Sequence, residues 1–368
     1  MKVNGTDIRP IGLDQDGKRV KIIDQRLLPH QLEIVDLYNV DDVIRAIKDM
    51  YVRGAPLIGV TGAYGVYLGI LNCDQPDHMI DHIENTCDRL IHARPTAVNL
   101  KWAVDKVRQT ILESTSYNEA VFRAKVKAQE ILEFEINNCK QIGQYGAELI
   151  QTISRQKQGK PVNILTHCNA GWLACIEYGT ATAPIYTAFD MGIPVHVWVD
   201  ETRPLNQGAR LTAWELLQYG VPHTVIVDNT GGHLMQHGMV DMVIVGSDRS
   251  TYTGDVANKI GTYLKALAAK DNGIPFYVAL PSSTFDWSIS DGINEIPIEL
   301  RDPHEIHYIS GIDQDDNVMS VRITPKKTTA VNYAFDVTPA RLVTGFITEK
   351  GVCKANEHDI LRLFPQKK

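Results

Sequence analysis

The chain has 368 residues, of which 44% are hydrophobic, and this is enough apolar material for two buried cores, so we expect two domains. A formal net charge of -7 and a pI near 5.9 disfavour general binding to nucleic acid or to an anionic membrane. No stretch reaches the roughly 18 consecutive apolar residues of a membrane span, and the first residues lack a signal-peptide apolar segment, so we expect a cytoplasmic protein. Six scattered cysteines predict free thiols.

The first part of the chain is predicted to form short strands followed by helices. Polar and apolar residues alternate over 19–25, which is typical of short strands. Apolar spacing predicts helices over 41–50, 56–71, 77–92, 97–114 and 118–155. The last is long enough to leave one domain and enter the next. We therefore expect a strand-capped helical domain over 1–145 and a Rossmann-like catalytic domain over 146–368.

From residue 161 onward, β-rich runs alternate with helical ones. Strands are predicted over 162–166, 195–199, 224–227, 242–245 and 276–280, with helices over 181–191, 209–218 and 256–269 between them. This rhythm predicts an α/β fold with a parallel, Rossmann-like sheet and right-handed crossovers. The polar region 281–327 breaks the rhythm and is predicted to be a long excursion or a lid-like hairpin. Residues 339–348 are predicted to form a closing helix capped by Thr338.

Two of the predicted strands end at reactive side chains about eighty residues apart in the sequence. The run 163–166 leads to Cys168, and the run 243–245 leads to Asp248. The carboxyl edge of a parallel sheet is where such folds place ligands, so a thiol and a carboxylate are expected to share one crevice. This pair suits proton transfer on a small molecule. The alternatives are a buried structural cysteine and an aspartate that caps a turn.

His167 precedes Cys168 but should point to the opposite face of an extended strand, so we interpret it as buried packing and not as a partner of the thiol. His233 and His237 have a spacing that a metal can use, but the glutamate of an HExxH motif is missing. The sequence also contains neither GxGxxG nor GxxxxGK[ST]. We therefore expect no metal and no nucleotide cofactor.

Several positively charged or amide side chains are candidates for holding an anionic ligand. Arg53, Gly54 and Ala55 precede a helix start, where free amides and a guanidinium favour a phosphate, although a tight turn with a surface arginine is the alternative. Arg94 precedes the helix 97–114 and is a second candidate, with a solvated arginine as the alternative.

The next candidates lie in the second half of the chain. Asn258 and Lys259 are predicted in the first turn of the helix 256–269, which favours an anion, although Lys259 could instead pair with Asp255. Gln207 lies in a polar loop after the strand 195–199 and can both donate to and accept from sugar hydroxyls. The alternative is a solvated loop whose charges pair with one another.

Six segments closely resemble the methylthioribose-1-phosphate isomerase family. They are residues 53–59, 94–100, 166–171, 201–204 together with 207–216, 254–263 and 334–342. That family belongs with the regulatory subunits of the eukaryotic initiation-factor guanine-nucleotide exchange complex and with ribose-1,5-bisphosphate isomerases. The resemblance implies interconversion of S-methyl-5-thioribose 1-phosphate and S-methyl-5-thioribulose 1-phosphate in methionine salvage, by a homodimer without metal.

The resemblance also assigns roles to matching positions. It implies that Cys168 is the catalytic cysteine and Asp248 the proton-donor aspartate. The implied substrate contacts are Arg53, Gly54, Ala55, Arg94, Gln207, Asn258 and Lys259.

Some positions depart from the family pattern. Ser247 stands where an alanine is common, Leu300 where a glutamate is common, and 230–232 where an alanine-rich run is common. Relatives acting on 5-deoxyribose 1-phosphate, ribose 1,5-bisphosphate or another 5-substituted pentose 1-phosphate would keep the same machinery, so these substrates stay open. A non-catalytic ligand-sensing regulatory subunit is the other alternative. The pair of Cys168 and Asp248 favours an enzyme, because a sensor has no use for both reactive groups.

Overall fold

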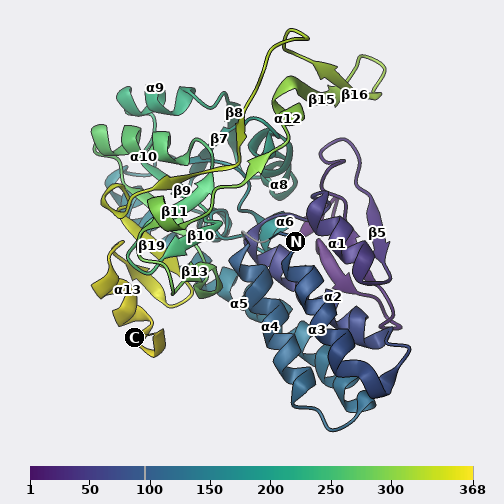
Figure 1. Cartoon of the computed structure of the whole chain (residues 1–368). Coiled ribbons are helices and arrows are strands. Elements are labelled where there is room, and N and C mark those ends of the chain that lie inside the picture. The colour runs from purple at the N-terminus through teal and green to yellow at the C-terminus, as the bar shows by residue number, and fades with distance from the viewer. Residues whose placement is uncertain (95–96, 368) are drawn as a thin grey trace.

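The computed structural model describes residues 1–94 and 97–367 (Figure 1). The chain begins with the predicted short strands. They are β1 (Lys2–Val3), β2 (Thr6–Asp7), β3 (Ile11–Leu13), β4 (Val20–Ile23) and β5 (Ile34–Leu37). β3, β4 and β5 form an antiparallel sheet. This sheet covers the helices that follow, because Ile11, Val20 and Ile22 are buried in one core with them.

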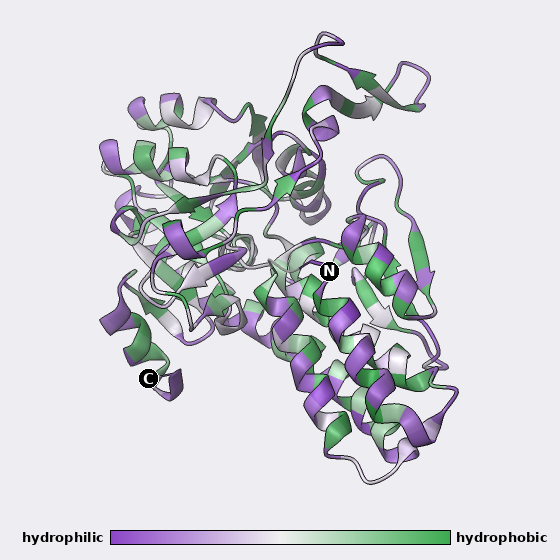
Figure 2. Cartoon of the chain, viewed as in Figure 1, coloured by the Kyte–Doolittle hydropathy of each residue, from purple (hydrophilic) through white to green (hydrophobic). Residues whose placement is uncertain are grey.

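The predicted helices are confirmed within a few residues at each end. They are α1 (Val40–Lys48), α2 (Ala55–Leu71), a short 3₁₀ helix (Pro76–His78), α3 (Met79–Ile91), α4 (Val98–Leu112) and α5 (Tyr117–Gln156). α2 is the central helix, and all of its residues except Leu71 are buried. The helices around it carry both polar and apolar residues in Figure 2, as expected where one face packs and the other meets water.

A large sheet forms the second half of the molecule. Its strands are β6 (Val162–Thr166), β7 (Val195–Asp200), β8 (His223–Ile226), β9 (Met242–Val245), β12 (Phe276–Ala279), β19 (Gly345–Thr348) and β20 (Gly351–Cys353). Across the described residues their order is β20-β19-β12-β9-β6-β7-β8, and only the β19–β20 pair is antiparallel. The predicted Rossmann-like α/β fold is confirmed. The chain moves outward from β6 to β8 and returns to β9 beside β6, so the strand order reverses between β6 and β9.

Helices pack against this sheet. They are α6 (Trp172–Cys175), α7 (Ala183–Asp190), a π-helical turn (Gly208–Thr212) continuing into α8 (Ala213–Tyr219), α9 (Thr230–Gln236), α10 (Thr262–Asp271) and α13 (Glu357–Leu363), with a final 3₁₀ helix (Pro365–Lys367). α5 crosses between the two halves without a break: Ile136 is buried in the core of the helical half and Ile142 in that of the sheet. The domain division near residue 145 stays a prediction.

The predicted closing helix 339–348 is wrong, and the predicted helix 256–269 is confirmed only from Thr262 onward as α10, because strand pairing between distant segments decides the structure of the other residues. A second sheet contains β13 (Phe285–Asp286), β10 (Arg249–Thr251), β11 (Val256–Lys259) and β18 (Phe335–Thr338). β11 pairs with β18, so Asn258 and Lys259 lie in a strand and not in the first turn of a helix. The predicted closing helix is instead a 3₁₀ turn (Ala340–Leu342) followed by β19 on the main sheet. Helix propensity is a weak preference that such pairing overrides.

The predicted excursion after β12 contains a hairpin formed by β15 (Tyr308–Ile312) and β16 (Val318–Arg322). The other elements between β12 and β18 are a 3₁₀ turn (Ser282–Thr284), α11 (Gly292–Glu295), β14 (Leu300–Arg301), α12 (His304–His307) and β17 (Asn332–Tyr333). The β15–β16 hairpin extends away from the main sheet in Figure 1. Arg203, in the loop after β7, contacts the base of the hairpin by donating to the carbonyl of Ile306 at 3.0 Å.

Among the described residues, no helix has the length and apolarity required to cross a membrane.

Candidate active site

Cys168 and Asp248 meet at the point where the strand order of the sheet reverses. Cys168 comes two residues after β6, and Asp248 comes three residues after the neighbouring strand β9. Both side chains line one cavity, which Arg53, Gly54, Ala55 and Asn258 also line. The expected shared crevice is therefore present. The cavity holds only about 30 Å³, room for about one water molecule, so a sugar phosphate would have to widen it on binding.

Cys168 has a strained backbone that its neighbours hold in place. Its φ is +66°, in the left-handed region that a non-glycine residue rarely adopts. Its amide donates to the Oγ1 of Thr202 at 2.8 Å, and the Oγ1 of Thr212 donates to its carbonyl at 2.7 Å. Burial raises the pKa of the Cys168 thiol, and the charges of Arg53 and Lys259 oppose that rise. This shift favours the neutral thiol at neutral pH.

Asp248 is also shifted toward its neutral form. Desolvation raises the pKa of its carboxyl group, and the nearby charges of Lys259, Arg94 and Arg53 oppose the rise. The side chain nevertheless keeps some contact with solvent. A carboxyl group whose pKa is raised can hold a proton closer to neutral pH, which is what a general acid requires.

Arg53 lines this cavity, and Lys259 lies near its Cys168 and Asp248, so two buried positive charges act on the site. Arg53 is 8% exposed and Lys259 is 6% exposed. Arg53 donates to the Oδ1 and the carbonyl of Asn169 at 2.5 and 2.7 Å. Burial lowers the pKa of Lys259, and the nearby Cys168 and Asp248 oppose this effect. Within residues 1–94 and 97–367, neither cation has a carboxylate within ion-pair distance, so the pair is suited to an anionic ligand.

The start of α2 adds a further feature suited to anions. Gly54 caps the helix with φ +94°, and a Cβ built there would lie 2.4 Å from the Cβ of Ala174. Only glycine fits this close approach. Because Gly54 and Ala55 line the cavity, the positive end of the α2 dipole lies beside it.

The remaining predicted contacts lie close by. Asn258 lines the same cavity and donates to the Oγ1 of Thr262 at 3.0 Å. Arg94 lines an adjoining cavity together with Asp248 and contacts Glu299 at 3.4 Å. Pro95 and Thr96, which belong to the same predicted motif, lie outside the described residues. Gln207 lines a further cavity of about 240 Å³. Arg53 lines both this cavity and the one that contains Cys168 and Asp248.

His167 is buried, as predicted, but its contacts are polar. Its Nδ1 lies 2.9 Å from an Oδ2 of Asp200, and its Nε2 lies 2.8 Å from the carbonyl of Ile260. His167, Asp200 and Asp228 are the described group whose ligand atoms are close enough for a metal. The ammonium of Lys265 lies 3.3 Å from Asp200 and already supplies a cation there. These contacts join the ends of β6, β7 and β11.

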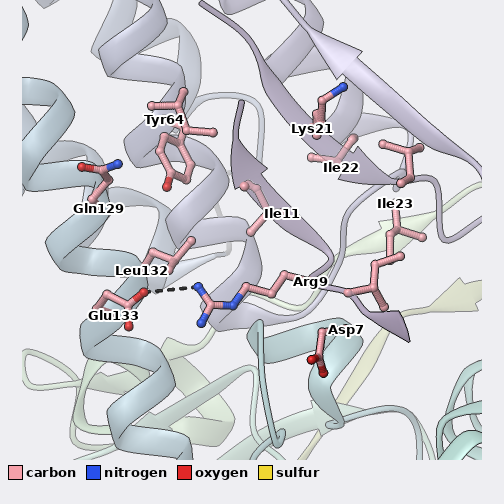
Figure 3. A pocket seen from close by; sticks show the side chains of 14 residues that line it. Asp7, Arg9, Ile11, Lys21, Ile22, Ile23, Tyr64, Gln129, Leu132 and Glu133 are labelled. Atoms are coloured by element: carbon pink, nitrogen blue, oxygen red, sulfur yellow. Dashed lines mark hydrogen bonds and ion pairs between the residues drawn. The ribbon is translucent and has the colours of Figure 1, made fainter. Parts of the chain in front are cut away.

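A much larger cavity lies elsewhere in the described part of the chain. It has a volume of about 660 Å³ and lies between the N-terminal strands and helices α2 and α5 (Figure 3). Arg9 crosses it toward Glu133, with the two groups 3.3 Å apart, and Tyr64 points into it. None of the predicted site residues lines this cavity, so size does not identify the site.

Comparison with known proteins agrees with the sequence resemblance. A model of the initiation factor 2 subunit family matches residues 51–355. The methylthioribose-1-phosphate isomerase of Desulfosudis oleivorans is 64% identical over 360 residues, which are 98% of each chain. The chain belongs to the initiation factor 2 subunit family. The enzyme of the same name from Desulfatibacillum aliphaticivorans is 61% identical over 368 residues and covers both chains completely.

Solved structures extend the likeness to the fold. The 5-methylthioribose 1-phosphate isomerase of Pyrococcus horikoshii OT3 matches with a TM-score of 0.84 and 36% identity, over 98% of this chain and 97% of that one. The translation initiation factor eIF-2B, subunit delta, from A. fulgidus matches with a TM-score of 0.80 and 37% identity, over 98% of this chain and all of that one. The described chain therefore shares the family fold over nearly its full length.

Proposed function

We propose that this protein is an aldose–ketose isomerase that converts S-methyl-5-thio-α-D-ribose 1-phosphate to S-methyl-5-thio-D-ribulose 1-phosphate in methionine salvage. The relatives that match the whole chain carry the name of this enzyme. The observation that carries the proposal is the shared cavity of Cys168 and Asp248, beside two buried cations without carboxylate partners in the described chain. A thiol and a raised-pKa carboxyl group supply proton-transfer chemistry, and the cations supply a phosphate site.

The phosphate on the anomeric oxygen prevents the sugar ring from opening as a free hemiacetal does. Arg53, Lys259 and the amides at the start of α2 bind the phosphate and place the sugar between the thiol and the carboxyl group. Asp248 donates its proton to the ring oxygen, because its raised pKa favours the protonated form. Ring opening then exposes C1 and C2 to Cys168.

The second step moves hydrogen from C2 to C1. In one route, Cys168 acts as a base and an enediolate forms. In the other, hydrogen moves directly as hydride and Cys168 stabilises the transfer. Turnover in deuterium oxide distinguishes them: an enediolate route puts solvent deuterium at C1, and a hydride shift does not.

The test of the assignment is a pair of substitutions. We expect Cys168→Ser and Asp248→Asn each to lower kcat at least about a hundredfold, because a positioned acid or base contributes about 10² to 10⁴ in rate. Circular dichroism and thermal unfolding check that both variants fold. Turnover near that of the wild type in either variant would refute the role of that residue.

The substrate, assembly and location need separate measurements. A panel of pentose 1-phosphates that differ at C5, including 5-deoxyribose 1-phosphate and ribose 1,5-bisphosphate, tests the substrate preference. Ketose formation from none of them would favour a regulatory ligand sensor, the reading that the likeness to an initiation-factor subunit raises. We further propose a cytoplasmic homodimer, and light scattering should give twice the chain mass of 41.1 kDa.

A further inference from the structure

A buried carboxylate from another part of the chain holds the loop that follows β6. Glu215 lies in α8 and has no solvent exposure. Its Oε1 accepts from the Nδ2 of Asn169 and from the amide of Leu173, both at 3.0 Å. Its Oε2 accepts from the amide of Trp172 at 3.0 Å and from the hydroxyl of Tyr186 at 3.2 Å. Four donors therefore converge on one carboxylate.

The side chain of Asn169 links Glu215 to Arg53 through two hydrogen bonds. Its Nδ2 donates to Glu215, and its Oδ1 accepts from the Nη1 of Arg53 at 2.5 Å. The orientation of the amide is fixed, because a carboxylate only accepts and a guanidinium only donates. The carbonyl of Asn169 also accepts from Arg53, at 2.7 Å. Arg53 is thus held in one plane by two contacts to a residue that Glu215 holds.

Two further features show how closely the carboxylate fits the loop. Thr212, one helical turn before Glu215, donates to the carbonyl of Cys168 at 2.7 Å, so the same helical segment holds both ends of the loop. A Cβ built on Gly171 would lie 1.8 Å from the Oε2 of Glu215. The loop therefore approaches the carboxylate as closely as glycine permits.

We propose that Glu215 is a positioning residue for anion binding. Through Asn169 it fixes the guanidinium of Arg53 in the orientation that binds a phosphate. Glu215 does not line the cavity of Cys168 and Asp248, so it acts through Asn169 and not by touching the ligand. The identification of this anion as the phosphate of the substrate rests on the proposed function.

The test is a double-mutant cycle on the binding of inorganic phosphate at pH 8, measured by calorimetry. Glu215→Gln keeps the shape of the side chain but turns one acceptor into a donor that faces two other donors. We expect Arg53→Met and Glu215→Gln each to weaken phosphate binding about tenfold. The double variant should be no weaker than Arg53→Met alone, because both changes remove the same contact.

The matched control is Tyr186→Phe, which removes one donor to the carboxylate and leaves the link to Asn169 and Arg53 intact. Its phosphate affinity should stay within about twofold of the wild type. Asn169→Leu breaks the link at its middle and should show the same lack of additivity with Arg53→Met. This second variant keeps the test decisive if Glu215→Gln does not fold.

The outcomes separate this inference from the proposed function. Additive effects of Glu215→Gln and Arg53→Met, or unchanged phosphate affinity in either single variant, would overturn the positioning role. If the wild type binds phosphate with the expected coupling but isomerises no pentose 1-phosphate, the inference stands and the proposed function fails. In an active enzyme, Glu215→Gln should also raise KM for the sugar phosphate more than it lowers kcat.

Discussion

Glu135 is a buried carboxyl group of α5 whose ionisation should make the stability of the protein depend on pH. It is 1% exposed, its Oε1 accepts from the Oγ of Ser283 at 2.7 Å, and its Oε2 has no hydrogen-bond partner among the residues that the structure describes. Burial, with a smaller contribution from Glu349, raises its pKa to about 7 from an ordinary value of 4.5. The folded state therefore binds this proton more tightly than the unfolded chain does.

The sign and size of the effect follow from that shift. The stabilising contribution is complete below about pH 4.5 and is lost as pH rises through 7. At 1.36 kcal/mol for each pKa unit, the loss amounts to about 3 kcal/mol. Glu135→Gln stays neutral at every pH, so its free energy of unfolding should gain about 3 kcal/mol relative to the wild type between pH 4.5 and 8.

Urea unfolding followed by circular dichroism at both pH values gives this difference directly. Glu148→Gln is the matched control, because Glu148 lies on the same helix but is exposed, and its substitution should leave the pH dependence unchanged. The free energy of unfolding of Glu135→Gln relative to the wild type is compared at the two pH values. If it changes by less than about 0.5 kcal/mol, the carboxyl group ionises as it does in water and the reasoning is wrong.

Two further predictions concern the site itself. Because the pKa of Asp248 is raised and its protonated form is the acid, kcat should fall as pH rises through that pKa; a stopped assay from pH 5 to 9 that shows a loss only on the acidic side would contradict this. Gly54→Ala forces a Cβ to within 2.4 Å of Ala174 at φ +94°, so it should destabilise the protein by about 2 kcal/mol or more and weaken phosphate binding. The control Gly159→Ala, at φ +85° with open space around it, should cost only about 1 kcal/mol in urea unfolding.

The amino-acid sequence alone located most of the elements and the two reactive groups. Apolar residues at helical spacing marked α2 to α5, and β-branched runs marked β6 and β9. These signals are local, because each depends on which face of a single element is buried. Cys168 and Asp248 could be predicted for the same reason: each follows an apolar run at a strand end. The resemblance to the isomerase family added the substrate and assigned roles to the candidate residues.

Tertiary structure decided the features that depend on distant partners. Whether residues 256–259 form a helix or a strand depended on β18, which pairs with them from about eighty residues away. The contact between Glu215 and Asn169 could not be predicted, because nothing near either residue in the chain indicates it. The reversal of strand order, which places β9 beside β6, is likewise a property of the whole sheet. Local sequence encodes the periodicity of each element, whereas pairing and burial between elements are fixed only when the chain folds.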